Sequence, residues 1–442
     1  MAARAGNGQL ASMDMESQNE ENFTQFLESG IYVFEDSNAV FVDPVRVLNR
    51  SYNHFKVSPS VYYARFFESQ RCNQDPRSAT TSRKGKRKRK QIAGKPRALS
   101  ERERIAEQRH LEARSFLLKA QESLQKSTAL LDVLSNLRND PSISTDCGVS
   151  TLSVVQQSFV ELGQVWQVPL FEITLNVHVS GQTNEDKEQR VHPAFNNLIA
   201  NETTDEAEAE FLNNHYIIPR ESCFYMSDMG QIHSLVPADA DSGFNLIVVD
   251  PPWENASAHQ KSRYPTLPNR YFLSLPIIQL THTEGALVAL WVTNREKLRG
   301  FVERELFPAW GVSYAATFYW LKVKANGSLI SDLDLFHHRP YESLILGYSH
   351  GKATKSDEQS NFRPVRDNYV IMSIPGDYSR KPPIAGMLKS LLLSWSDLLM
   401  EYVPGLRPAR CIELFAREMI AGWVSWGNEP LHFQDCRFFL RR

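Results

Sequence analysis

A short apolar run that ends in an aspartate, two prolines and a tryptophan constrains the fold most. Residues 244–253 read FNLIVVDPPW. The run is short and rich in β-branched residues, so it predicts a strand buried in a parallel sheet. Because the prolines cannot continue a hydrogen-bonded ladder, the strand must end at Asp250. Ligands bind at the carboxyl ends of strands in open α/β sheets, so Asp250 is either a site residue or a cap for the next turn.

Further short apolar segments alternate with helical patterns along the second half of the chain. The predicted strands cover residues 222–228, 285–294, 314–323, 342–349, 409–416 and 421–429, and a helix is predicted over 382–403. This alternation predicts an α/β fold with a doubly wound, mostly parallel sheet. The sequence has neither a GxGxxG fingerprint nor a phosphate-binding glycine-lysine loop, which disfavours dinucleotide oxidoreductases and NTPases.

Composition bounds the class of protein. The 442 residues are 42% hydrophobic and carry a net charge of −2, enough apolar surface for a sizeable core and no general nucleic-acid signature. The five cysteines are scattered without a CxxC pair, which argues against a disulfide framework or a zinc site and favours a reducing compartment. No segment resembles a signal peptide or a membrane helix, so we expect a protein that is neither secreted nor membrane-spanning.

The first half of the chain is less regular. Residues 82–90, SRKGKRKRK, carry seven basic side chains and predict a solvated linker that serves as a nuclear import signal, with nucleic-acid attraction as a compatible second role. Residues 100–140 predict a long amphipathic helix or hairpin that opens with a capping box formed by Ser100 and Glu103. Alternation over 169–181 predicts a half-buried strand, whereas the acidic residues 201–210 predict the start of a solvated helix or a linker.

These patterns divide the chain into four regions. We expect a partly disordered N-terminal region (1–80), a basic linker (81–99), a middle domain with helices and strands (100–210) and a main domain (211–442).

The DPPW tetrapeptide offers a specific chemistry. A planar exocyclic amine is a poor nucleophile because its lone pair is delocalised into the ring. The Asp250 carboxylate and the Pro251 carbonyl could accept its two N–H bonds and bring the nitrogen towards tetrahedral geometry. Proline fixes φ, and Trp253 offers a base an aromatic face. An in-line methyl donor would complete the transfer without a strong base.

Three further motifs follow DPPW along the chain. SRKP (379–382), IELFAR (412–417) and WGNE (426–429) come after it. With DPPW they resemble the eukaryotic mRNA adenosine N6-methyltransferase family. The basic tract, the long N-terminal region and HHRPYESLILGY (337–348) are most similar to the methyltransferase-like four branch of that family. The resemblance covers residues 215–442.

The resemblance implies a Rossmann-like methyltransferase domain with S-adenosylmethionine as the methyl donor and no metal. Its implied catalytic residues are Asp250, Pro251, Pro252 and Trp253. Its implied cofactor-binding residues are Asp228, Met229, Asp250, Lys381, Arg417, Asn428 and Glu429, and its implied substrate-binding residues are Tyr264, Arg339, Glu342 and Arg380. Arg380 and Glu429 stand where relatives often carry His and Gln. Trp291, Phe318 and Trp320 are expected in the core, and Lys322 either near nucleic acid or in solvent.

The implied function is transfer of a methyl group to N6 of adenosine in RNA, with N6-methylation of 2′-O-methyladenosine in U2 small nuclear RNA as the specific expectation. The alternatives are the same reaction on DNA, a non-catalytic nucleic-acid-binding subunit, and methylation of a protein amide. The expected partners are RNA (small nuclear RNA or mRNA) or DNA and no membrane, the chain could act as a monomer, and the expected location is the nucleus, with the cytoplasm as a second site.

Overall fold

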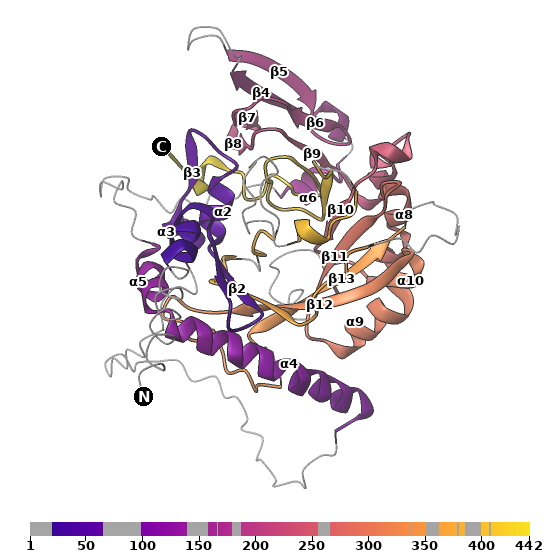
Figure 1. The fold of residues 1–442 in the computed structure, drawn as a ribbon. Helices are drawn as coiled ribbons and strands as arrows, with labels where there is room; N and C mark the ends of the chain where they lie inside the picture. The colour runs from indigo at the N-terminus through magenta and orange to yellow at the C-terminus, as the bar shows by residue number, and fades with distance from the viewer. Residues whose placement is uncertain are drawn as a thin grey trace, which may run out of the picture.

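The structure is a computed structural model. It describes residues 20–64, 99–138, 158–165, 167–178, 187–254, 266–336, 338–350, 362–377, 380–384, 399–405 and 408–442. Figure 1 shows a large central sheet with helix α4 (Glu101–Lys126) crossing one side of it and a smaller sheet at the top of the view. Within these residues, no helix is both long and apolar enough to cross a lipid bilayer.

The central sheet has eleven strands. Their spatial order is β1 (Ile31–Phe34), β2 (Ala39–Val42), β14 (Tyr369–Ser373), β12 (Val312–Lys322), β13 (Tyr341–Ser349), β11 (Ala286–Val292), β10 (Leu246–Val249), β15 (Cys411–Leu414), β16 (Trp423–Gly427), β9 (Ser222–Met226) and β6 (Leu198–Asn201). Every segment predicted as a strand in the second half of the chain is confirmed. Most of the predicted helix over 382–403 lies outside the described residues.

The directions of the strands show at which edge of the sheet a site is expected. β10 pairs in parallel with β11 on one side and with β15 on the other, and the parallel run continues through β16 to β9. β13 is antiparallel to β11 and β12, and β6 is antiparallel to β9. This mostly parallel α/β sheet confirms the predicted Rossmann-like fold class, and the carboxyl ends of five neighbouring strands meet at one edge.

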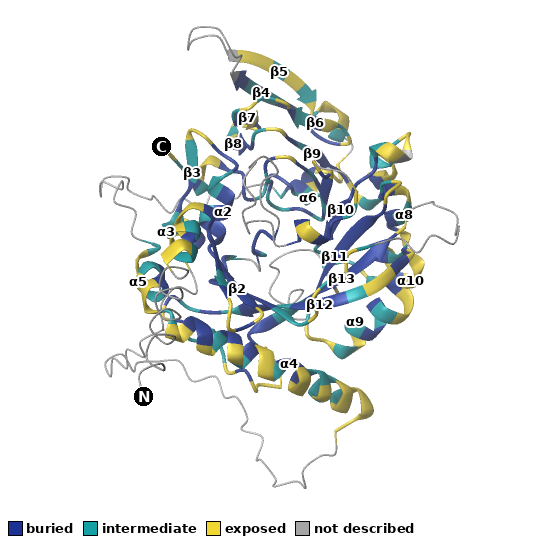
Figure 2. Ribbon diagram, viewed as in Figure 1, coloured by how far each residue is buried: buried dark blue, intermediate teal, exposed yellow. Residues whose placement is uncertain are grey.

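Strand β10 is buried on both faces, as its sequence predicts (Figure 2). Leu246 and Val248 face one core cluster, whereas Ile247 and Val249 face another. The second cluster includes side chains of α9 (Glu296–Phe301), of the π-helical turn η5 (Val302–Leu306) and of α10 (Phe307–Ala309). Trp291, Phe318 and Trp320 are all buried, which confirms the expectation for them.

Helix α4 continues after a break into α5 (Thr128–Asn136), and Ser100 and Glu103 form the predicted capping box. Leu117 and Leu124 of α4 are fully buried in a cluster that includes Phe41 of β2 and Met372 of β14. The amphipathic pattern therefore marks a helix that packs against one end of the central sheet.

The smaller sheet has the order β5 (Lys187–Pro193), β4 (Glu172–His178), β7 (Ala207–Phe211) and β8 (Asn214–Ile218). The strand predicted within 169–181 is confirmed as β4. The helix or linker predicted for 201–210 is wrong, because this segment contains β7. Ala207 and Ala209 are buried there, whereas Glu208 is half-buried and Glu210 is exposed, and alanine is a weak signal for a strand.

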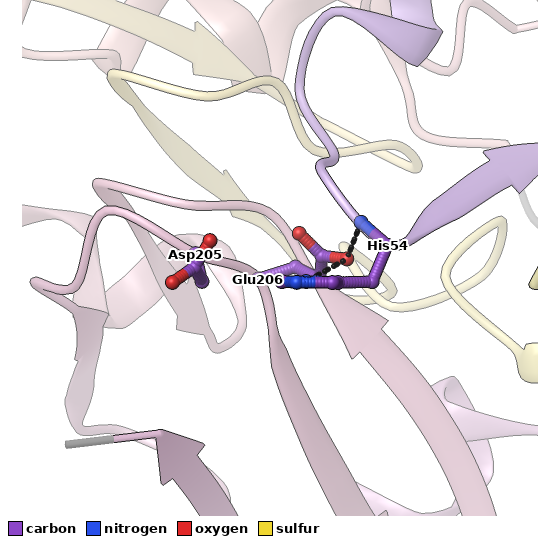
Figure 3. Close-up of side chains that lie close together, drawn as sticks. All are labelled: His54, Asp205 and Glu206. Carbon is purple, nitrogen blue, oxygen red and sulfur yellow. Dashed lines mark hydrogen bonds and ion pairs between the residues drawn. The ribbon is translucent and has the colours of Figure 1, made fainter. Parts of the chain in front are cut away.

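One buried carboxylate ties the N-terminal region to this part of the molecule (Figure 3). Glu206 accepts hydrogen bonds from the backbone N–H groups of Asn53, at 2.7 Å, and His54, at 2.5 Å. Asn53 also donates through its side chain to Asp205 at 2.7 Å. The carboxylate of Glu206 thus connects two segments that are distant in sequence through hydrogen bonds.

The remaining elements are short. They are α2 (Pro44–Asn49), β3 (Phe55–Val57), α3 (Pro59–Tyr62), α6 (Phe159–Leu162), η1 (Val168–Leu170), η2 (Met229–Leu235), η3 (Ala240–Ser242), η4 (Asn269–Ser274), α8 (Ile277–Leu280), η7 (Met400–Tyr402), η8 (Cys436–Phe438) and β17 (Phe439–Arg441). The division of the chain at residue 211 stays a prediction. The central sheet takes its two outermost pieces, the β1–β2 hairpin and β6, from residues before that point.

Candidate active site

A cavity of about 590 Å³ lies at the carboxyl edge of the parallel strands. It brings together most of the residues that the sequence singles out. These are Asp228, Met229, Asp250, Pro251, Pro252, Trp253, Glu342, Lys381, Arg417, Asn428 and Glu429. They come from segments spread over two hundred residues. The shared direction of β9, β10, β15 and β16 gathers the residues that follow these strands, and Glu342 reaches the same edge because it opens the antiparallel strand β13.

The DPPW segment turns tightly as it leaves β10. The backbone N–H of Asp250 donates to Leu414 of β15 at 3.2 Å, which extends the ladder by one residue. The N–H of Trp253 donates to the carbonyl of Pro251 at 2.7 Å. A carbonyl oxygen has two lone pairs, so the Pro251 carbonyl keeps one acceptor position for a substrate N–H.

Asp250 belongs to a network of charges inside the cavity. Lys381 Nζ lies 3.2 Å from Asp250 Oδ1 and 3.4 Å from Glu342 Oε2. Glu342 also forms an ion pair with Lys322. The side chains of Asp250, Lys381 and Glu342 are only 13–16% exposed, so water screens these pairs weakly.

The network shifts the protonation of its members. Burial alone would raise the pKa of Glu342, but the Lys322 and Lys381 ammonium groups outweigh burial and lower it to about 2. Burial likewise opposes the charge on Lys381, and the Asp250 and Glu342 carboxylates outweigh it, so the pKa of Lys381 is raised. Both groups therefore stay charged through the neutral range.

Trp253 is more deeply buried than a side chain that only stacks on a substrate base would need to be. Its side chain lines the cavity, yet the residue is only 7% exposed. The indole N–H donates to the backbone carbonyl of Trp291 at 2.8 Å, and the ring meets Phe272 edge-on with centroids 5.1 Å apart. Trp253 thus anchors the DPPW turn to β11 in addition to any contact with a base.

The motifs do not identify two acids near Asp250, Glu413 and Glu418, as site residues. Glu413 of β15 lies beside Val248 in the parallel register and lines a small adjoining cavity with Asp250, Lys381 and Glu418. Burial, followed by the charges of Asp250 and Glu418, raises the pKa of Glu413 to about 8. The IELFAR motif contains Glu413, but its sequence does not reveal that three carboxylates converge there.

Arg380 lies outside the main cavity. Its guanidinium lies 4.3 Å from the ring centroids of both Tyr62 and Phe433, and Nε donates to Glu418 at 2.9 Å. The residue is 4% exposed and lines the small adjoining cavity. The structure therefore gives Arg380 a place in the core, and its predicted contact with substrate is not among those brought together here.

Of the other predicted substrate residues, Glu342 lines the main cavity whereas Arg339 does not. Arg339 donates to Glu107 of α4 at 2.7 Å and to the Leu335 carbonyl at 3.0 Å, beside a separate cavity of about 370 Å³. Tyr264 lies outside the described residues. Lys322 is not a solvated side chain, because it is paired with Glu342 and its Nζ lies 4.3 Å from the Trp320 ring centroid. Its proximity to nucleic acid stays a prediction.

Sequence reasoning missed one whole wall of the cavity. This wall comes from residues upstream of the predicted main domain, namely Phe159, Val160, Gly163, Gln164, Val168, Phe195 and Asn196. Tyr271, Thr293 and Arg295 line other parts of the cavity and were missed as well. The upstream residues carry no motif. The pairing of β6 with β9 brings Phe195 and Asn196 to the edge, and Phe159 joins them through a shared hydrophobic cluster.

Comparison with known proteins agrees with this geometry. Residues 244–429 match the MT-A70 family. The chain is 35% identical over 247 residues to the mouse N(6)-adenine-specific methyltransferase METTL4, covering 55% of this chain and 49% of that protein. It is 31% identical over 229 residues to the N6-methyladenosine RNA methyltransferase MTA1 of Pyricularia oryzae, covering 50% and 55% of the two chains.

A third relative is the DNA N6-methyl methyltransferase of Caenorhabditis elegans, 32% identical over 231 residues, which are 51% of this chain and 56% of the relative. The chain spans about half the length of the curated relatives it matches. The matched residues include the DPPW turn, the lysine that holds its aspartate and the strand ends around them. Residues 244–429 therefore form an MT-A70 family domain, and the chain resembles the METTL4-like branch of that family.

Proposed function

We propose that the chain is an S-adenosylmethionine-dependent methyltransferase that acts on the exocyclic amine of adenosine in RNA. The observation that carries the proposal is the placement of Asp250. Its carboxylate follows the central strand β10, lies in the main cavity and is held by the buried Lys381 at 3.2 Å.

In this proposal, the residues around the amine have separate roles. Asp250 accepts one N–H of the target amine, and the Pro251 carbonyl accepts the other through its second lone pair. Lys381 orients the Asp250 carboxylate, so the acceptor is in place before substrate arrives and needs no reorganisation during the reaction. A base in a duplex cannot reach this cavity, so the target adenosine must be single-stranded or flipped out of its stack.

The cavity fits a nucleoside-sized methyl donor in addition to a base. Its volume of about 590 Å³ lies within the range of small-molecule sites, and polar groups are spread along it. S-Adenosylmethionine would supply an activated methyl group. Asn428 and Glu429 offer partners for ribose hydroxyls, while Asp228 and Met229 lie at the end of β9 for the donor's base.

RNA is the leading substrate, and 2′-O-methyladenosine in U2 small nuclear RNA is the specific target that we propose. The likeness to an RNA methyltransferase supports RNA, and the likeness to a DNA methyltransferase makes DNA the second candidate. A non-catalytic subunit is disfavoured because an intact DPPW turn and its lysine line an open cavity.

Mass spectrometry of nucleosides tests this proposal. Pools of RNA and DNA would be incubated with the full chain and labelled donor, and N6-methylated adenosine and deoxyadenosine counted. We expect label in RNA, and its loss in Asp250→Ala. Asp239→Ala, an exposed aspartate outside the cavity, is the matched control. Label confined to DNA would overturn the RNA assignment, and no label in either pool would overturn the activity.

The basic tract supports a nuclear location. Residues 82–90 lie outside the described residues, so the proposal rests on their composition. Replacing their Lys and Arg with Ser should shift the full chain to the cytoplasm without changing its thermal transition. Unchanged nuclear accumulation would contradict the proposal.

A further inference from the structure

The wall of the cavity that lies outside the MT-A70 domain has a chemistry of its own. It combines the aromatic side chains of Phe159 and Phe195 with the amide side chains of Gln164 and Asn196. The two phenylalanines are 7% and 6% exposed, whereas the two amide residues are exposed. An apolar face with amides at its rim suits a flat heterocycle whose edge carries donors and acceptors.

Sheet topology explains why this wall stands at the site. β6 runs antiparallel to β9, so the residues that precede β6 meet the carboxyl end of β9. The backbone N–H of Asn196 donates to the Met226 carbonyl at 2.9 Å, and Asp228 follows two residues later. Residues from before position 200 therefore adjoin the Asp228–Met229 strand end that the sequence analysis assigned to the donor.

Packing holds the wall in place. Phe159 stacks on Phe211 with ring centroids 5.9 Å apart, and Phe195 meets Phe211 and Phe171 edge-on at 6.1 Å and 6.0 Å. The same core cluster contains Phe224 and Met226 of β9. The wall and the central sheet thus share one core, so the shape of the cavity is set before a ligand enters.

Distance decides which ligand group lies against this wall. β9 is the third strand from β10 in the order β10-β15-β16-β9. Adjacent strands lie about 4.8 Å apart, so the two strand ends are separated by roughly 14 Å. A target adenine at Asp250 cannot reach the upstream wall. A donor whose base lies over β9 can extend towards Asp250.

We propose that Phe159, Phe195, Gln164 and Asn196 bind the adenine end of the methyl donor, so that the donor site is completed by residues outside the MT-A70 domain. This inference rests on the proposed function. It assigns positioning and specificity roles to a segment for which the sequence offers no motif.

The test removes the two amides without disturbing the core. Asn196 has a φ of 55°, so Asn196→Gly keeps its backbone conformation, and Gln164→Ala changes an exposed side chain. Calorimetry on the full chain would measure two probes, S-adenosylhomocysteine and 5′-deoxy-5′-methylthioadenosine, which lacks the amino-acid end. We expect the double variant to bind both probes about 10-fold more weakly, by a similar factor.

Asn213→Gly is the matched control. Asn213 also has a positive φ, of 62°, lies exposed in the turn between β7 and β8, and does not line the cavity. It should bind both probes like the parent chain. The thermal transitions of the two variants should agree to within a few degrees, which separates lost contacts from lost structure.

A second pair of variants probes the volume of the wall. A Cβ built on Gly163 would lie 3.3 Å from the Phe159 carbonyl and 3.5 Å from the Phe195 ring. The contact with the carbonyl is tight, so Gly163→Ala requires a small shift of the neighbouring backbone and serves as the steric control. Gly163→Met should in addition fill the space against the wall and weaken the binding of both probes by at least about 10-fold.

The outcomes separate this inference from the proposed function. If the parent chain methylates adenosine but the amide and Gly163→Met variants bind both probes normally, the inference is overturned and the function stands. If only S-adenosylhomocysteine weakens, the wall contacts the amino-acid end and the assignment is overturned. If the parent chain binds neither probe and transfers no methyl group, the function fails and the inference with it.

Discussion

The two walls of the cavity are built on different physical principles. The wall around Asp250 comes from the MT-A70 domain and consists of opposed charges with little exposure to water. The wall around Phe195 comes from upstream residues and consists of stacked aromatic rings. The charged wall determines where an amine reacts, and the aromatic wall determines the shape of the cavity. They should therefore respond to different perturbations, the first to charge and pH and the second to volume.

The largest effect should follow from removing the carboxylate of the charged wall. Asp250→Ala should lower the rate of methyl transfer by at least about 10²–10³-fold, because it deletes one preorganised acceptor for the target amine. Binding of S-adenosylhomocysteine should change little. Single-turnover kinetics and calorimetry would measure the two quantities. A folded variant that transfers methyl groups at nearly the parent rate would reduce Asp250 to a turn cap.

Lys381→Met should have the next largest effect. It leaves Asp250 and Glu342 without their shared cation, and losing a charge-assisted hydrogen bond costs about 1.5–3 kcal/mol. If Lys381 mainly orients Asp250, the turnover number falls; if it binds the donor carboxylate, donor affinity falls. Lys322→Met is the control, since its ion pair is with Glu342. Equal activity losses in both variants would show that only the charge on Glu342 matters.

The pH dependence of stability should expose Glu413. Its pKa in the folded chain is about 8, above the ordinary value of 4.5, so the stability linked to its protonated form is full below about pH 4.5 and is lost as pH rises through 8. Compared with Glu413→Gln, the parent chain should lose roughly 2 kcal/mol between pH 6 and 8, since each pKa unit corresponds to about 1.4 kcal/mol. Parallel melting-temperature curves for the two proteins would contradict this expectation.

Trp253→Phe should separate the anchoring role of Trp253 from its ring. The substitution keeps an aromatic face but removes the indole N–H that donates to Trp291, so the free energy of unfolding should fall by about 1 kcal/mol. Denaturant titration would measure it. If the variant stays folded and binds the donor normally but loses most of its activity, the indole itself contacts the base.

The smallest effect should come from the aromatic wall. Phe159→Leu should lower the free energy of unfolding by roughly 1 kcal/mol through poorer packing against Phe211. Because no titratable group is involved, this loss should be the same at pH 5 and pH 8, unlike the effect at Glu413. A clear pH dependence for Phe159→Leu would break the distinction between the two walls.

The sequence predicts features whose cause is local. β10 is readable because its β-branched run and its prolines mark a buried strand and its end, and the capping box of α4 is readable because both partners lie within one turn. The gathering of Asp250, Lys381 and Asn428 follows from motifs at strand ends. β7 was misread because two of its three apolar residues are alanines that alternate with glutamates. The place of Arg380 in the core and the upstream wall depend on contacts between distant segments, which no local pattern encodes.

The position of the β1–β2 hairpin has a consequence for biosynthesis. β2 pairs with β14, which begins only at Tyr369, so the hairpin leaves the ribosome long before its partner exists. At about 5–20 residues per second, its edge stays unpaired for on the order of tens of seconds. An exposed strand edge invites pairing with other chains, so the nascent protein should depend on chaperones until its last third has emerged.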